Sequence, residues 1–199
     1  MATAFSVKFN LDAVLAQLAT QLPQRVAVGA ARAINRTAAS ERTALSSDIA
    51  GDMGIRVGTA RDAMTVNKAT ASNPTAQVVC KGARLPLIEF NARGPEPSRG
   101  RGGGVSYSNP GAGGTQRIAN AFIATMPGGG HRGVFVRKGQ QRSRKGLPAH
   151  SPGLPIREPM GPSIVKSFEK MVPAGEARRT DSLVKNLEHE ISFALSQGA

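Results

Sequence analysis

Apolar residues in the first part of the chain follow two spacings, first alternating and then helical. Phenylalanine and valine alternate with polar neighbours over residues 4–9, which predicts a short half-buried strand. Leu11–Leu22 then has apolar residues at helical spacing and predicts a first helix. Pro23 interrupts this pattern and is expected to open a second, longer helix.

The longest helical pattern runs from Gln24 to about Asp52. Its apolar face is rich in alanine, which allows close packing against a neighbouring element, and consists of Ala27, Ala30, Ile34, Ala38, Leu45 and Ile49. The opposite face is polar and basic and consists of Arg25, Arg32, Arg36, Ser40, Thr43 and Ser47. Gly51 and Gly54 are expected to end the helix.

After this helix, Thr59–Val66 is predicted to be a short helix with Met64 facing inward. The hydrophobic period then shortens from helical to alternating. Four β-rich runs follow, at Thr75–Lys81, Leu85–Phe90, Ile118–Thr125 and Gly133–Lys138. Pro86 marks the second run as an edge or a bulge. Glycine turns bound these runs, which is typical of an antiparallel meander.

Two helices are expected near the C-terminus. Pro162 suits the first turn of one helix, and Thr180 or Asp181 suits the cap of the other. Apolar residues recur at helical spacing in both, with Ile164, Phe168 and Met171 in the first and Val184, Leu187, Ile191 and Leu195 in the second. The patterns together predict an α+β fold, in which N-terminal helices and a C-terminal helix pack on a small antiparallel β-sheet with long Gly/Arg-rich loops.

Two segments lack a hydrophobic period. Residues 94–114 hold eight glycines and three prolines, and residues 137–153 are basic with almost no apolar content. Both are predicted to be long mobile loops that extend from the sheet. With 199 residues the chain can bury a core of ordinary size, so we expect a single domain over residues 1–199.

The net charge of the chain restricts its possible functions more than the size of its core does. Lys and Arg number 26 against 13 Asp and Glu, which gives a net charge of +13 and an isoelectric point near 11.2. Eleven basic and two acidic residues lie between Arg84 and Lys145, so most of the excess belongs to strand ends and loops. Such a chain favours polyanions or acidic protein surfaces as partners over a small-molecule substrate.

The residue pattern predicts no catalytic, cofactor-binding or metal site. Cys80 is the only cysteine, which excludes an internal disulfide and a cysteine zinc cluster. His131, His150 and His189 lie far apart without ligand spacing, and a solvated surface position is favoured for each. No carboxylate pair or phosphate-binding loop is indicated. With neither a signal-peptide pattern nor a membrane-spanning run, we expect a soluble protein of a reducing cytoplasm.

Seven basic residues in the two loop segments are the candidate contact residues: Arg99, Arg101, Arg137, Lys138, Arg142, Arg144 and Lys145. Two contacts are open for them: they neutralise phosphates of DNA of any sequence, or they pair with acidic residues of neighbouring subunits. For Arg99 and Arg101 a third interpretation, a flexible loop that charge keeps soluble, is favoured over nucleic-acid binding. Aromatic residues are only 4% of the chain, and the lack of stacking side chains disfavours recognition of a nucleic-acid sequence.

Several segments, in a fixed order, resemble a known family. They are Ala30–Ala38 with Ile55-Arg56, Thr70–Ala76, Leu85–Arg93, Asn120–Ala124 before Gly130–Val136, and Leu154–Ser163. In that order they resemble the minor tail protein Z family of long-tailed phages and prophages, also described as tail completion proteins. The resemblance covers roughly residues 24–195, and the family has no catalytic residues to carry over. Residues 94–114 depart from the family pattern in their high glycine content.

The resemblance implies a virion component at the head-proximal end of the tail, or neck, which makes the tail competent to join a filled head. We expect a homo-oligomeric ring, a hexamer in preference to a dodecamer, assembled in the host cytoplasm. Its expected partners are tail-tube or terminator proteins, head-connector proteins and the end of the genome DNA. The alternative is a basic nucleic-acid-binding protein with no role in the virion, and an enzyme is disfavoured.

Overall fold

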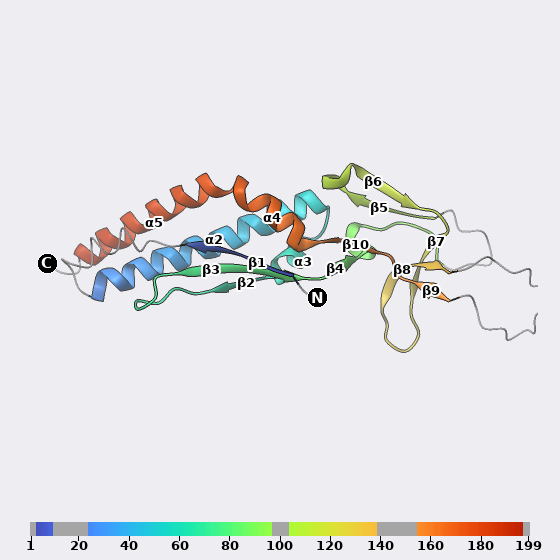
Figure 1. Cartoon of the computed structure of the whole chain (residues 1–199), viewed down its shortest axis with the longest axis horizontal. Helices are drawn as coiled ribbons and strands as arrows, with labels where there is room; N and C mark the ends of the chain where they lie inside the picture. Colours follow the sequence, from blue (N-terminus) through green and yellow to red (C-terminus); the bar gives the residue numbers. More distant parts are fainter. Residues whose placement is uncertain (1–2, 10–23, 97–103, 139–154, 197–199) are drawn as a thin grey trace, which may run out of the picture. The chain divides into compact units, whose positions relative to one another are not determined.

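The computed structural model describes residues 3–9, 24–96, 104–138 and 155–196, and Figure 1 shows its elements. The chain divides into two compact units. Unit 1 comprises Met1–Gly51, Arg56–Ala83 and Ser163–Ala199, and unit 2 comprises Asp52–Ile55 and Arg84–Pro162. The helix predicted over Leu11–Leu22 lies outside the described residues and stays a prediction.

Unit 1 contains a three-stranded antiparallel sheet in the order β1-β3-β2. Its strands are β1 (Thr3–Phe9), β2 (Met64–Asn67) and β3 (Ala76–Gly82). In β3 the side chains of Ala76, Val78 and Cys80 are fully buried, whereas the residues between them are more exposed. One face of the sheet therefore belongs to the core, as is common for an antiparallel sheet.

The strands predicted over residues 4–9 and 75–81 are confirmed. The helix predicted over Thr59–Val66 is wrong in its second half. Val57–Asp62 forms the short helix α3, but Met64–Asn67 pairs with β3 as strand β2. Pairing with the next strand along the chain outweighs local helical spacing here. Met64 is buried as expected.

Three more helices of unit 1 lie in the described residues. α2 (Gln24–Met53) confirms the predicted long helix, and it ends where Gly54 adopts a φ of +69°. Its alanine-rich face is buried at Ala30, Ile34, Ala38, Leu45 and Ile49. α4 (Ile164–Ala174) packs against β1 and β3. α5 (Glu176–Ser196) runs antiparallel to α2, because Gly29 lies beside Glu190 while Glu41 lies beside Arg179.

Both C-terminal helices begin at residues other than those predicted. Pro162 lies in a strand, and the cap of α4 is Ser163, whose Oγ accepts a hydrogen bond from the Val165 N–H at 3.3 Å. α5 begins at Glu176, after Gly175 alone separates it from α4. Thr180 is therefore inside α5, where its hydroxyl donates a hydrogen bond to the Glu176 carbonyl at 3.1 Å.

The residues of unit 2 that the structure describes form three small sheets. One pairs β4 (Arg84–Pro86) with β10 (Met160–Ser163), and one pairs β5 (Val105–Asn109) with β6 (Gly114–Ile118). The third is antiparallel, in the order β7 (Ala121–Thr125), β8 (Arg132–Arg137) and β9 (Ile156–Arg157). The buried side chains of the unit include Leu87, Phe90, Val105, Ile123 and Val134. Together with the helices of unit 1, these sheets confirm the α+β fold class, and β8 confirms the strand predicted over Gly133–Lys138.

Two predicted strands of unit 2 are shorter than expected. The strand predicted over Leu85–Phe90 ends at Pro86, which has no N–H for the ladder. Residues 87–90 instead form the 3-10 helix η1 (Leu87–Phe90). The strand predicted over Ile118–Thr125 is interrupted at Asn120, whose φ of +59° turns the chain from β6 into β7.

The glycine-rich segment at 94–114 contains regular structure that was not predicted. Residues 105–109 form β5, and η2 (Pro110–Ala112) connects it to β6. Gly113 and Gly114, at φ of +93° and +89°, supply the left-handed backbone that this tight connection requires. Residues 97–103 and 139–153 of the two predicted loops lie outside the described residues, so the mobility of these loops stays a prediction. The single domain also stays a prediction.

Candidate functional site

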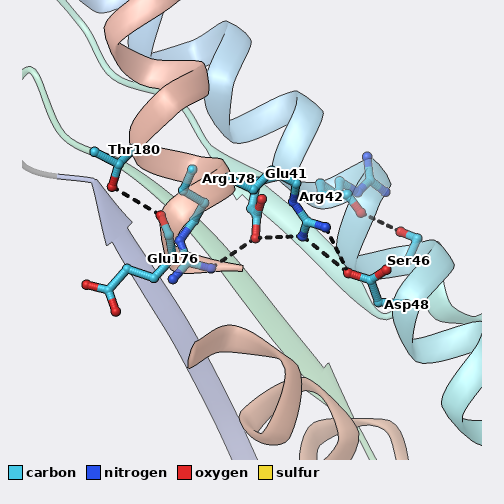
Figure 2. A network of polar contacts seen from close by, with 8 residues as sticks. Glu41, Arg42, Ser46, Asp48, Glu176, Arg178 and Thr180 are labelled. Atoms are coloured by element: carbon cyan, nitrogen blue, oxygen red, sulfur yellow. Dashed lines mark hydrogen bonds and ion pairs between the residues drawn. The ribbon is translucent and has the colours of Figure 1, made fainter. Parts of the chain in front are cut away.

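A buried carboxylate joins the start of α5 to the middle of α2 (Figure 2). Glu41 of α2 is 3% exposed, and its Oε1 accepts hydrogen bonds from Arg179 at 3.0 Å and Arg178 at 3.5 Å. Both terminal nitrogens of Arg178 also donate to Asp48 at 3.2 Å. Partial burial lowers the pKa of Arg178. Its hydrogen bonds to Glu41 and Asp48 and the negative charges of these two side chains have the larger combined effect, so the pKa of Arg178 is raised above its ordinary value. The two arginines of α5 therefore face α2.

Further polar contacts follow along the same helix pair. Asn186 of α5 donates a hydrogen bond to the hydroxyl of the buried Thr37 at 2.9 Å. The buried carboxylate of Glu190 lies 3.5 Å from a terminal nitrogen of Arg36. A Cβ on Gly29 would lie 3.5 Å from the Glu190 carbonyl oxygen, so the two backbones approach closely there. These contacts define the register of α5 on α2.

The sheet of β7, β8 and β9 carries a row of rings that ends in an arginine. The rings of His131 and Phe135 lie edge to face at 6.2 Å, and those of Phe135 and Phe122 are tilted at 6.2 Å. The guanidinium carbon of Arg137 lies 5.3 Å from the centre of the Phe122 ring, a cation–π arrangement. The sequence does not predict this row, because Phe122 meets Phe135 only through the pairing of β7 with β8.

Two acidic side chains near this row have basic partners. Nε2 of His131 lies 3.0 Å from the Glu158 carboxylate, and Arg132 lies 3.4 Å from that of Glu96. A Cβ on Gly133 would lie 2.5 Å from Glu158 Oε1, so this glycine leaves room for the carboxylate. His131 is half exposed, as expected for a surface histidine. Over the described ranges, no group of three His, Cys, Asp or Glu residues could hold a metal ion.

Two of the seven predicted contact residues lie in the described part of the chain. Arg137 ends β8 and Lys138 follows it, and both are exposed. The Lys138 N–H donates a hydrogen bond to the Pro155 carbonyl at 2.6 Å, directly before β9. The other five lie outside the described residues, so their contacts stay predictions; they are Arg99, Arg101, Arg142, Arg144 and Lys145.

Arg157 is an exposed basic residue of the same sheet end, and sequence reasoning did not single it out. In the pairing of β8 with β9, Arg157 lies opposite Val136 and Ile156 lies opposite Arg137. Ile156 is 38% exposed and shares the face of Arg137, whereas Arg157, the next residue of the strand, points to the opposite face. No local pattern could have found this cluster, because it depends on the register of two strands that are distant in sequence.

The remaining sequence candidate is Cys80, which is buried in β3. Burial raises the pKa of its thiol to about 11, so very little of the nucleophilic thiolate is present near neutral pH.

None of the helices in the described part of the chain is long and apolar enough to cross a membrane. The exposed charged residues of α5 and of the β7–β9 sheet are the candidate functional surfaces of the described part of the chain.

Comparison with known proteins agrees with the resemblance read from the sequence. The prophage minor tail protein Z family matches residues 11–197 of the 199-residue chain. No curated protein and no solved structure matches the chain. The family is one of structural phage tail proteins rather than a class of enzymes. Because its match covers residues 11–197, far more than half of the chain, this chain belongs to the prophage minor tail protein Z family.

Proposed function

We propose that this protein completes the head-proximal end of a phage tail and enables the tail to join a filled head. The observation that carries the proposal is the family match over residues 11–197, since a minor tail protein is a virion component. A protein that acts by assembly needs complementary surfaces rather than a substrate pocket. The exposed charged residues of α5 and of the β7–β9 sheet suit that requirement.

The proposed arrangement is a ring around the DNA channel, between the tail tube or its terminator and the head connector. Unit 2 holds twelve Lys and Arg residues against four Asp and Glu residues, whereas unit 1 holds fourteen against nine. The smaller unit therefore carries a net +8, which supports contact with DNA phosphates. A basic nucleic-acid-binding protein outside the virion is the alternative, and the family match disfavours it.

Loss of the gene tests the assembly function. Phage that lack this chain should produce tails that do not join heads, so that filled heads accumulate separately. Expression of the wild-type chain from a second copy of the gene should restore joined particles, as electron microscopy and infectivity would measure. Infectious particles of normal yield without the protein would contradict the proposal.

A charge-removal variant tests the DNA contact. We expect the protein to bind duplex DNA of any sequence, with affinity falling by roughly 0.9 log units per log unit of salt for each phosphate contacted. Replacing Arg142, Arg144 and Lys145 with alanine should flatten this slope by about 2–3 units and leave assembly intact. The matched control removes three exposed basic residues of unit 1: Arg32, Arg61 and Lys166.

The control variant should keep the wild-type slope, because its charges are not part of the proposed contact. Equal flattening in both variants would indicate only a general charge effect. An unchanged slope together with lost assembly in the first variant would assign its three residues to neighbouring subunits instead of DNA.

A further inference from the structure

The apolar side chains of α5 are less covered than those of the helix before it. α4 buries Ile164 and Phe168, whereas among the side chains of α5 that the structure describes no large apolar one is buried. Leu183, Leu187 and Ile191 are half-buried and follow one another at intervals of four residues, so they form a ridge along the helix. We refer to these three residues as the apolar ridge.

The apolar ridge does not point directly at α2. The face of α5 that contacts α2 is polar, since Asn186 donates a hydrogen bond to α2 and Glu190 lies beside its Gly29. With 3.6 residues per turn, Leu187 and Ile191 lie about 60° and 100° around the helix from Glu190, both on the same side. The ridge therefore borders the contact with α2, and a third apolar element is needed to cover it.

A segment of the chain with an apolar stripe of its own precedes α2. Residues 10–23 lie outside the described residues, and their sequence predicts an amphipathic helix over Leu11–Leu22. Asp12 is the one charged residue of this segment. Its large aliphatic residues share one stripe and are Leu11, Val14, Leu15, Leu18 and Leu22. Such a helix is stable only where an apolar surface covers its stripe.

The sheet and α2 fix the two ends of this segment. Phe9 pairs with the first residue of β3, at the sheet end where Ala69 and Asn35 exchange hydrogen bonds of 2.7 and 2.9 Å. α2 begins at Gln24, which is about 16 Å before Asn35 along the helix axis. A helix over Leu11–Leu22 is about 18 Å long and spans this distance. It would run antiparallel to α2 and therefore in the same direction as α5.

The apolar ridge lies beside the same stretch of α2. Because Glu190 lies beside Gly29, Ile191 is level with the middle of the stretch between Gln24 and Asn35. Leu18 occupies the corresponding point of the predicted helix, about 10 Å from its start. Leu18 and Ile191 are therefore expected at one level.

We infer that Leu11–Leu22 forms a helix that packs on the apolar ridge of α5 in the same chain. Both surfaces are aliphatic, and the two ends of the segment hold it beside the ridge. Tethering of this kind gives an effective concentration on the order of millimolar, with which a second copy or another tail protein would have to compete. The ridge is then part of the core of unit 1. This contact does not depend on the proposed role in the tail.

Thiol labelling measures whether the ridge is covered. All variants are full-length and carry Cys80→Ala, so that the introduced cysteine is the one reactive thiol. The thiol introduced by Ile191→Cys should react with a maleimide about tenfold more slowly than the thiol introduced by Ser192→Cys, which takes an exposed position. Equal labelling rates at the two positions would overturn the contact.

Charges on the segment test whether it provides the cover. Val14→Asp with Leu18→Asp places two charges on the apolar stripe and should raise the labelling rate of Ile191→Cys to about that of Ser192→Cys. The matched control, Ala16→Asp with Thr20→Asp, places the same charges at the same spacing on the opposite side of the predicted helix and should keep the slow rate. An unchanged slow rate in both variants would overturn the assignment to this segment.

A disulfide provides a second measurement that needs no disruptive substitution. Leu18→Cys with Ile191→Cys should form an intramolecular disulfide on oxidation, whereas Leu18→Cys with Ser192→Cys should not. Non-reducing electrophoresis separates the products, and far-UV circular dichroism verifies that each variant is folded. A disulfide-linked dimer, or slow labelling that appears only at concentrations where the chain assembles, would assign the ridge to a neighbouring copy and overturn the inference. Absence of the disulfide in a folded variant would also overturn it.

Discussion

Replacing Glu41 with alanine removes a buried anion and leaves a buried cation behind. Glu41 is 3% exposed, and the Arg179 side chain, 11% exposed, lies 3.0 Å from it. Removal of one partner of a buried ion pair costs about 3–5 kcal/mol, because the other charge stays desolvated. Arg178 keeps Asp48 as a partner and is 43% exposed, so it adds little. We expect a loss of about 3 kcal/mol in the free energy of unfolding of unit 1, at the lower end of that range.

Urea unfolding followed by far-UV circular dichroism measures this loss, since α2 and α5 dominate the helical signal. The control is Arg132→Ala, which breaks a pair whose side chains are 55% and 73% exposed and should cost less than about 1 kcal/mol. The double variant Glu41→Ala with Arg179→Ala should be more stable than the sum of the single losses predicts, because no lone buried charge remains. A loss for Glu41→Ala no larger than that of the control would refute the reasoning.

Two further predictions concern the cores of the units. Gly161→Ala should destabilise unit 2 by about 1–3 kcal/mol in urea unfolding, because the added Cβ would lie 2.5 Å from the buried Phe90 ring. The control Gly129→Ala places its Cβ in open space and should leave stability unchanged. Burial raises the pKa of Cys80 from 9.0 to about 11, so between these pH values the unfolded chain loses a proton that the native chain keeps. As the pH rises over that interval, the unfolding free energy of the wild type should therefore fall relative to that of Cys80→Ala by up to about 1.4 kcal/mol per pH unit. If the unfolding free energies of the two proteins changed in parallel with pH, this prediction would be contradicted.

The local spacing of apolar residues predicted the elements whose own sequence determines which of their side chains are buried. The long helix α2 and the central strand β3 have regular apolar spacing, and both were located to within a few residues. Local spacing predicts a helix where strand β2 lies, because Met64–Asn67 is extended only through its pairing with β3. Glycine content alone suggested a loop where Gly113 and Gly114 in fact make a hairpin connection.

The candidate surfaces were less predictable than the fold. The charge excess pointed to Arg137 and Lys138, but the neighbour Arg157 depends on the register of β8 and β9. Glu41 is the single acid among the buried residues of α2, and its partner Arg179 lies 138 residues away in sequence. Such contacts are set by tertiary structure and leave no trace in local spacing.

The interleaving of the two units affects the order in which the chain can fold during synthesis. Residues 84–162 of unit 2 separate the first strands and α2 of unit 1 from α4 and α5. At about 5–20 residues per second, a ribosome needs on the order of 4–16 s to translate that stretch. During this time α4 does not yet cover β3, because α4 packs against that strand only after residues 164–174 have been synthesised. The middle of the nascent chain can therefore finish folding before the unit whose sequence flanks it.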